Sequence, residues 1–217
     1  MKSYVIPTVF AANKEQFDAR LEKLVKASKN IQIDFMDGEF VPLEGVDLDE
    51  MPNLQKYKRK FEAHLMCKFP EIYIDKLTEK GFYKAIVHYE AISGSREIKT
   101  LLDFIKGSGL EAWIAINPET DIWEIAPYLH HAEGILVMGV HPGKEKQKLI
   151  HSIIGKINDL REMNHFIKIQ VDGGVNIVNA SLLRKAGANL INSGSFVSDA
   201  KNPKIALQQL NKAFLKD

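Results

Sequence analysis

The chain alternates short apolar runs with longer amphipathic stretches, and this alternation limits the folds that it can adopt. The runs that could form strands are Tyr4–Phe10, Asn30–Met36, Lys60–Met66, Ala85–His88, Ala112–Ile116, Gly134–Val140, Ile167–Asp172 and Leu190–Ser193. Helical patterns are clearest at Lys14–Lys29, Pro70–Lys80, Ser95–Lys106, Lys146–Asn164 and Pro203–Leu215. Strands separated by helices pair in parallel through right-handed crossovers. Eight strands in 217 residues therefore predict an α/β fold, a (β/α)8 TIM barrel forming a single domain over residues 1–217.

Composition narrows the class of protein. A chain of 217 residues with 45% hydrophobic residues can bury one sizeable core. The formal net charge is +1 and no basic tract alternates with aromatic residues, so we expect no nucleic-acid partner. The single cysteine, Cys67, suits a reducing compartment. Met1–Phe10 is too short for a signal peptide and no apolar run reaches membrane-spanning length, so we expect a cytoplasmic protein with no membrane contact.

The stretch from Lys168 to Phe196 has the pattern of a phosphate site. One apolar run ends in Asp172-Gly173-Gly174, and the next ends in Ser193-Gly194-Ser195. Glycine lets the backbone approach an anion closely, and TIM barrels commonly bind phosphate after strands seven and eight. The alternative is a pair of tight turns that bind no ligand.

Polar residues gather at the ends of several predicted strands. Gln32 and Asp34 share one face of their strand, which in a barrel is the interior, and His64, His88 and Asp172 end other strands. A buried carboxylate is costly unless it is paired, hydrogen-bonded or bound to metal. These residues favour a ligand or catalytic site over a purely structural polar layer.

The same segments resemble the ribulose-phosphate 3-epimerase family from the first strand to the last helix. The matching runs are QIDFMDGEFVP (Gln32–Pro42), EAHLM (Glu62–Met66), HYEA (His88–Ala91), MGVHPG (Met138–Gly143), VDGGV (Val171–Val175) and AGAN…SGS (Ala186–Ser195). Their order and spacing support the resemblance and its fold, and the resemblance implies a small phosphorylated sugar as ligand.

The resemblance implies an isomerase of pentose phosphate and carbohydrate metabolism. In the family, one aspartate removes the C3 proton of D-ribulose 5-phosphate to give an enediolate, and a second returns a proton on the opposite face to give D-xylulose 5-phosphate. The matching residues are Asp34 and Asp172. Two carboxylates can hold opposite protonation states if their environments separate their pKa values. The structural alternative is a buried hydrogen-bonded pair.

The resemblance also implies the surroundings of these acids. The phosphate would lie on Gly173, Gly174, Val175, Gly194 and Ser195, and the substrate pocket would include Met36, Met66, Met138, His141 and Gly143. The methionines are equally consistent with ordinary packing.

Departures from the family pattern concern the metal. The family holds a divalent metal with His, Asp, His and Asp, and the matching residues here are Gln32, Asp34, His64 and Asp172. Gln32 offers a neutral amide oxygen, which suits Zn poorly. We therefore expect a site degraded relative to the family, holding Mn, Mg, Fe or Zn, or no metal.

Other departures affect the pocket. Ala11 replaces a serine that orders substrate hydroxyls in the family, and GKEKQ (Gly143–Gln147) replaces a glycine-rich lid and adds Lys144 and Lys146. His141 stands where the family usually has Asn. It either compensates for the imidazole missing at position 32 or hydrogen-bonds the turn that follows it.

Two hypotheses for the function follow. The first is an epimerase acting on a phosphorylated ketose through Asp34 and Asp172; the second is a catalytically altered barrel that binds a sugar phosphate in a regulatory role. A decarboxylase is disfavoured because the strand carrying Asp34 has no lysine in the Asp-x-Lys-x-x-Asp pattern of those enzymes. The family also forms dimers or larger rings, so a homo-oligomer is one expectation.

Overall fold

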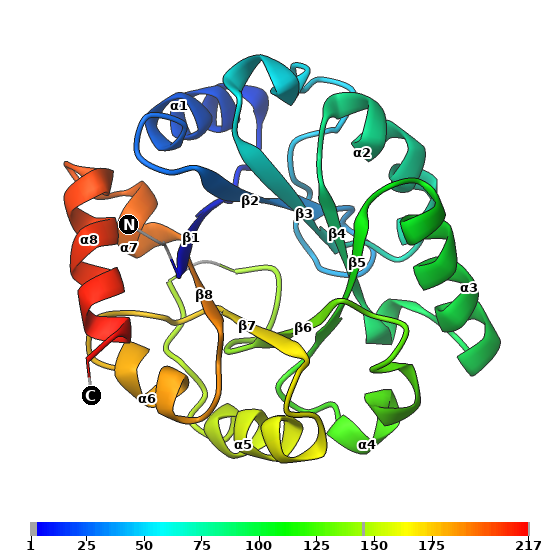
Figure 1. The fold of residues 1–217 in the computed structure, drawn as a ribbon. Coiled ribbons are helices and arrows are strands. Elements are labelled where there is room, and N and C mark those ends of the chain that lie inside the picture. The colour runs from blue at the N-terminus through cyan, green and yellow to red at the C-terminus, as the bar shows by residue number, and fades with distance from the viewer. Residues whose placement is uncertain (1–3, 145, 217) are drawn as a thin grey trace.

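Eight parallel strands close into one barrel in the computed structural model, which describes residues 4–144 and 146–216 (Figure 1). The strands are β1 (Val5–Val9), β2 (Asn30–Met36), β3 (Lys60–Met66), β4 (Lys84–His88), β5 (Glu111–Ile116), β6 (Gly134–Met138), β7 (Lys168–Asp172) and β8 (Leu190–Ser193). Each strand pairs with its sequence neighbours, and β1 pairs with β8. The predicted TIM barrel is confirmed.

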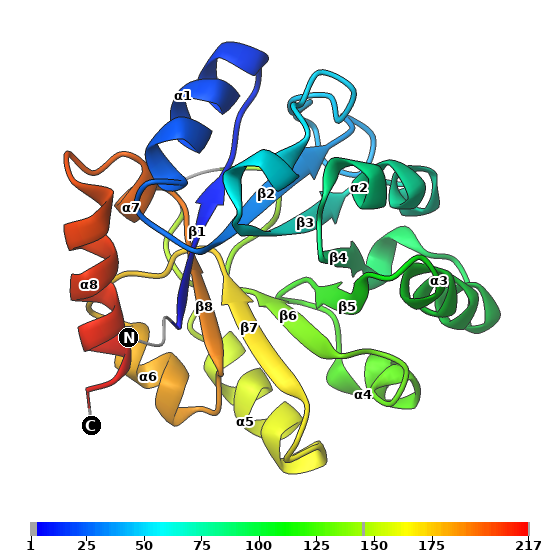
Figure 2. The ribbon, with the colours of Figure 1, turned by 45° about the horizontal axis from the view of Figure 1, so that its top comes forward.

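Helices form the outer ring (Figures 1 and 2). They are α1 (Lys14–Leu24), α2 (Ile74–Lys80), α3 (Ser95–Gly107), α4 (Ile122–Ile125), α5 (Ile153–Met163), α6 (Ala180–Lys185), α7 (Ser195–Ser198) and α8 (Pro203–Phe214). Short 3-10 helices lie at η1 (Leu54–Tyr57), η2 (Pro70–Tyr73), η3 (Tyr89–Ala91) and η4 (Ala126–Tyr128). The connection Gly45–Tyr57 contains the short helix η1.

Two predicted helix boundaries are wrong. The pattern at Lys146–Asn164 predicts a helix from Lys146, but α5 begins only at Ile153. Lys146 has a φ of 61°, outside the helical region, and the backbone N–H of Ile150 donates to the carbonyl of Gly139 at 2.8 Å. Tertiary contacts with the end of β6 therefore override the local helical periodicity. The helix expected over Lys14–Lys29 also ends early, at Leu24.

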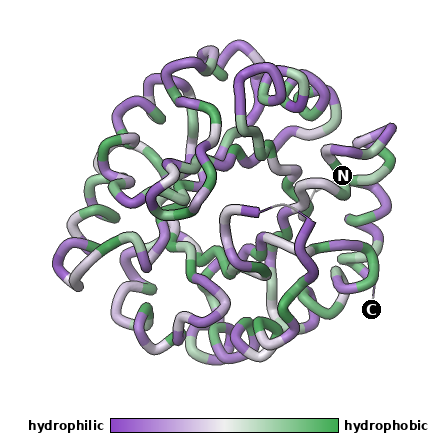
Figure 3. The backbone as a smooth tube through the Cα atoms, turned by 180° about the vertical axis from the view of Figure 1, so that it is seen from behind, coloured by the Kyte–Doolittle hydropathy of each residue, from purple (hydrophilic) through white to green (hydrophobic). Residues whose placement is uncertain are grey.

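The strands carry two different faces. Outward residues such as Ile31, Ile33 and Phe35 are buried in the main apolar core under the helices. The helices themselves alternate hydrophilic and hydrophobic residues along the tube (Figure 3), as amphipathic helices packed on a barrel do.

The interior of the barrel is divided into an apolar and a polar part. Ile86, Trp113, Ala115, Leu136 and Met138 form a separate apolar cluster. The polar part comprises Gln32, Glu62, Lys84, Gln170 and Asn192, which are all at most 1% exposed. Burying so many polar groups is tolerable only if they satisfy one another, which makes their contacts the first place to look for a site.

Between β6 and α5, residues 139–144 and 146–152 lie over the centre of the ring in Figures 1 and 3. They follow the carboxyl end of β6, so they cover the mouth at which TIM barrels carry their active sites. Among the described residues, no helix combines the length and apolar character needed to cross a membrane.

Candidate active site

Strand register brings three ionisable side chains to one point at the mouth. Asp34 on β2 is paired with His64 on β3, and Asp172 ends β7 opposite Met138 of β6. All three side chains are buried, and one ligand atom from each lies within 4.8 Å of the others. The inward placement of Asp34 follows from the alternation of β2, which also turns Gln32 inward one layer deeper.

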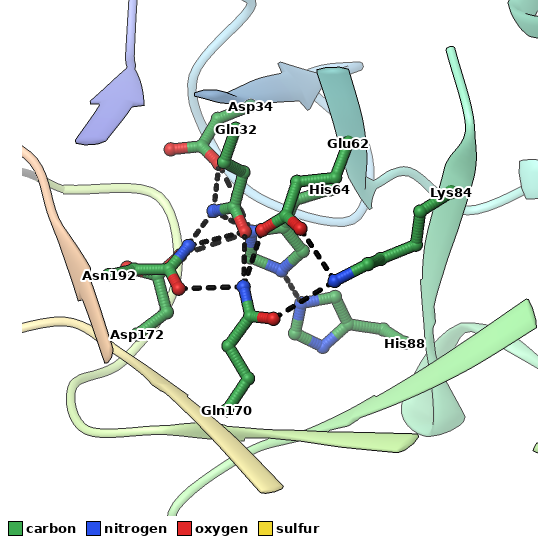
Figure 4. A network of polar contacts seen from close by, with 9 residues as sticks. All are labelled: Gln32, Asp34, Glu62, His64, Lys84, His88, Gln170, Asp172 and Asn192. Carbon is green, nitrogen blue, oxygen red and sulfur yellow. Dashed lines mark hydrogen bonds and ion pairs between the residues drawn. The ribbon is translucent and has the colours of Figure 1, made fainter. Parts of the chain in front are cut away.

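Gln32 bridges the two carboxylates (Figure 4). Its Nε2 donates to Oδ1 of Asp34 at 2.9 Å and to Oδ2 of Asp172 at 2.5 Å. One amide group therefore uses both of its hydrogens on the two acids. The neutral Gln32 amide, one layer deeper in the barrel, therefore holds the two carboxylates close together.

A chain of imidazoles approaches the acids from the other side (Figure 4). Nδ1 of His64 lies 3.1 Å from Oδ1 of Asp34, and Nε2 of His64 lies 2.9 Å from Nε2 of His88. Nδ1 of His88 donates to the carboxylate of Glu90 at 3.1 Å, and Glu90 also accepts from the backbone N–H of Asn117 at 2.7 Å. Because His88 donates through Nδ1, its Nε2 is left to accept from His64, and the remaining nitrogen of His64 faces the acids.

Burial and neighbouring charges shift the pKa values in this cluster. Burial, followed by the negative charge of Asp34, raises the pKa of Asp172. Burial lowers the pKa of His88 to about 4, against the opposing effect of the hydrogen bond that His88 donates to Glu90. For His64, burial alone would lower the pKa, but the hydrogen bond and charge of Asp34 outweigh it and raise the pKa. Asp172 is thus an acid that keeps its proton more readily than an ordinary aspartate.

A cavity of about 490 Å³ opens above the acids, within the size range of small-molecule sites. The predicted phosphate residues Gly173, Gly174, Val175, Gly194 and Ser195 all line it, together with Asp34, His64 and Asp172. Gly173 and Gly174 have φ values of 100° and 68°. A Cβ on Gly174 would clash with the backbone nitrogen of Leu149, so the turn requires glycine there.

The other residues expected in the pocket divide into two groups. Met66, Met138 and Gly143 line the cavity. Met36 does not line it and packs in a small apolar cluster with Val41 and Met66. His141 also lies outside the lining, and its Nε2 contacts Oε1 of Glu119 at 2.7 Å on the exposed surface. His141 therefore does not replace the imidazole missing at position 32.

The structure adds cavity residues that the sequence reasoning missed. Thr8 and Ser193 both line the cavity, and within the described chain neither buried hydroxyl has a hydrogen-bond partner. A buried hydroxyl without a partner is unusual and suggests that a ligand would supply one. For Thr8, the signal in the sequence was the inward alternation of β1, which pairs Thr8 with Gln32. Lys144 and Lys146 also line the cavity, and Nζ of Lys146 lies 3.2 Å from Oδ2 of Asp199.

Asp34, His64 and Asp172 form a group that could hold a metal ion. Two carboxylates and one imidazole leave coordination positions open, as catalytic metal sites do. Gln32 is not part of this donor set, because it presents N–H groups to the carboxylates rather than its oxygen.

A closed parallel barrel with buried acids at its mouth, next to glycine turns after its last two strands, has the architecture of a TIM-barrel enzyme. The sequence model of the ribulose-phosphate 3 epimerase family matches residues 4–198. The chain belongs to this family, whose members are epimerases acting on carbohydrates.

Relatives of known function resemble the chain along most of its length. It is 32% identical to a ribulose-phosphate 3-epimerase of Eremothecium gossypii, covering 94% of this chain and 90% of the relative. The enzyme of the same name from Bacillus subtilis is 30% identical, with 95% of this chain and 97% of the relative covered.

Solved structures share the fold at lower identity. The 3-hexulose-6-phosphate synthase of Salmonella typhimurium superposes with a TM-score of 0.71 at 15% identity, covering 98% of each chain. KGPDC of Streptococcus mutans also gives a TM-score of 0.71, at 11% identity, covering 99% of this chain and 98% of the other. At these identities the likeness shows that the chain shares the barrel fold of these structures.

Proposed function

We propose that the protein interconverts D-ribulose 5-phosphate and D-xylulose 5-phosphate, with Asp34 and Asp172 as the acid/base pair. The observation that carries this proposal is the meeting of two buried carboxylates at one donor, the Gln32 amide, in the floor of a cavity lined by glycine turns. The named relatives favour this function over the alternative of a barrel that only binds a sugar phosphate.

The chemistry is a proton transfer at the carbon beside a ketone. One ionised aspartate takes the C3 proton, and the electrons of the broken C–H bond form the C2–C3 double bond while charge moves to the C2 oxygen. The other aspartate, in its acid form, gives its proton to C3 from the opposite face, and the ketone is restored. In the direction that starts with Asp172 protonated, Asp34 acts as the base, consistent with the raised pKa of Asp172.

Charge on the enediolate must be stabilised while it exists. A divalent metal held by Asp34, His64 and Asp172 would supply Lewis-acid stabilisation of the enediolate oxygens. The hydroxyls of Thr8 and Ser193 are placed to hydrogen-bond hydroxyls of the substrate. We propose that the phosphate lies on the turns Gly173–Val175 and Gly194–Ser195, with Lys144 and Lys146 close by. A cytoplasmic location and a homo-oligomeric state stay predictions from the sequence.

The test is epimerisation of D-ribulose 5-phosphate by the purified protein, after chelation and after addition of Zn, Mn, Fe or Mg. We expect turnover that Asp172→Asn lowers by about 10²–10⁴-fold. Absence of turnover with every metal, together with no exchange of the C3 proton in deuterated water, would overturn the proposal.

A further inference from the structure

The barrel interior contains a buried ion pair that no step above uses. Nζ of Lys84 lies 2.5 Å from Oε2 of Glu62, and each side chain is 1% exposed. The ammonium also lies 3.8 Å from the centroid of the Trp113 ring. This buried pair touches neither carboxylate of the acid pair, so a role in the site must act through other residues.

The ion pair fixes the orientation of the Gln170 amide. Lys84 can only donate, and its Nζ donates to Oε1 of Gln170 at 3.0 Å. The Glu62 carboxylate accepts from Nε2 of Gln170 at 2.5 Å. With oxygen towards Lys84 and nitrogen towards Glu62, Gln170 cannot rotate its amide by 180° without placing like groups together at both contacts.

The orientation of Gln170 fixes the orientations of two further amides, those of Asn192 and Gln32 (Figure 4). The second hydrogen of Gln170 goes to Oδ1 of Asn192 at 2.7 Å. Asn192 must therefore turn its Nδ2 towards Gln32, and it donates to Oε1 of Gln32 at 2.5 Å. With its oxygen engaged, Gln32 can present only N–H groups to Asp34 and Asp172.

We propose that the Lys84–Glu62 pair orients Gln32 through Gln170 and Asn192, so that Gln32 is a positioning residue that donates to both acids and is barred from offering its oxygen to a metal. Any divalent metal at Asp34, His64 and Asp172 then competes with two N–H donors for its carboxylate ligands. This inference rests on the proposed function insofar as the two acids are the acid/base pair, and its test needs no turnover.

The test inverts the orientation of Gln32. In Asn192→Asp the new carboxylate accepts only, which favours turning the N–H groups of Gln32 towards residue 192 and, once Mn²⁺ is bound at the acids, its oxygen towards the metal. We expect Mn²⁺ binding, measured by calorimetry on the intact protein, to tighten by about tenfold or more, the usual scale of effects from partners of metal ligands. Asn192→Leu, which imposes no orientation, is the matched variant and should tighten binding less.

The added negative charge could tighten Mn²⁺ binding by itself, so a double-mutant cycle separates the two effects. In a Gln32→Met background there is no amide to invert. The proposal requires the effect of Asn192→Asp on Mn²⁺ affinity to be smaller there than with Gln32 present. An equal effect in both backgrounds would overturn it.

A measurement on the unaltered protein covers the case in which Asn192→Asp does not fold. Nε2 of Gln32 lies 3.5 Å from Nδ1 of His64. The side-chain amide protons of Gln32, assigned by their loss in Gln32→Met, should therefore show nuclear Overhauser contacts to the His64 ring. Contacts to the Asn192 amide protons in place of the ring would mean the reverse orientation and would sink the proposal. Neither result depends on whether ribulose 5-phosphate is a substrate.

Discussion

The imidazoles of His64 and His88 stack with their ring centroids 5.0 Å apart and their Nε2 atoms 2.9 Å apart. Two nitrogens at this distance share one hydrogen, so the two rings cannot both be protonated without repulsion. Glu90 accepts a hydrogen bond from Nδ1 of His88. This leaves Nε2 of His88 without a hydrogen, so the hydrogen between the two rings belongs to His64. Glu90 thus influences, through His88, whether Nδ1 of His64, the nitrogen that faces the acids, carries a proton.

His88 should make stability fall in acid. Its pKa is about 4 in the folded protein and 6.5 ordinarily, so the unfolded chain binds more protons between these values. The stability contributed by the neutral ring is present above pH 6.5 and is lost as the pH falls towards 4. Denaturant unfolding across this range should give a smaller loss for His88→Gln than for the unaltered chain. Parallel pH profiles for the two proteins would contradict this assignment.

Each acid should serve one face of the substrate. Removing either carboxylate leaves the other able to act on one epimer, so Asp34→Asn and Asp172→Asn should each lose about 10²–10⁴-fold in epimerisation, the range for a general acid or base. Each variant should retain exchange of the C3 proton with deuterated water for one epimer only, and for opposite epimers. Mass spectrometry of recovered substrate measures this. Loss of exchange from both epimers in both variants would argue against two acids on opposite faces.

Breaking the buried ion pair should destabilise the fold. Lys84→Met leaves the Glu62 carboxylate without its cation in the barrel interior, which costs about 3–5 kcal/mol in the free energy of unfolding. The double variant Lys84→Met/Glu62→Gln removes the stranded charge and should recover part of this loss. Urea unfolding of the three proteins gives the comparison. A single variant as stable as the unaltered chain would show that the pair is not buried as the structure has it.

Thr8 should affect substrate binding more than folding. Since its buried hydroxyl has no partner among the described residues, Thr8→Val loses no protein hydrogen bond. We expect the KM for ribulose 5-phosphate to rise by about three- to tenfold, the value of one hydrogen bond. Thr8→Ser restores the hydroxyl and should restore the KM. An unchanged KM in Thr8→Val would remove this residue from the site.

The fold was more predictable from the sequence than the contacts within the site. Strand periodicity placed β2 and β3 at their observed bounds, because alternation in a barrel is enforced on every residue by burial. The start of α5 was not predictable in this way, since Leu149 and Ile150 are held by β6 and β7 rather than by their own helix. Local periodicity cannot report a contact made with another strand.

The acids and the glycine turns were also visible in the sequence, and the structure brings them to one cavity. The orientation of Gln32 was not visible. An amide can present oxygen or nitrogen, and the choice here depends on Asn192 and Gln170, which lie 160 and 138 residues away along the chain. The sequence suggests that Gln32 offers its amide oxygen to a metal, whereas in the structure its amide nitrogen donates hydrogen bonds to Asp34 and Asp172.

The loop after β6 and the turn after β7 are built into one another. The N–H of Gly139 donates to the carbonyl of Asp172 at 2.6 Å, the carbonyl of Gly139 accepts from Ile150, and Gly174 has no room for a side chain beside Leu149. Exchanging the loop after β6 would therefore remove part of the wall against which the Gly173–Val175 turn packs. An engineered change in either segment should therefore be made together with a matching change in the other.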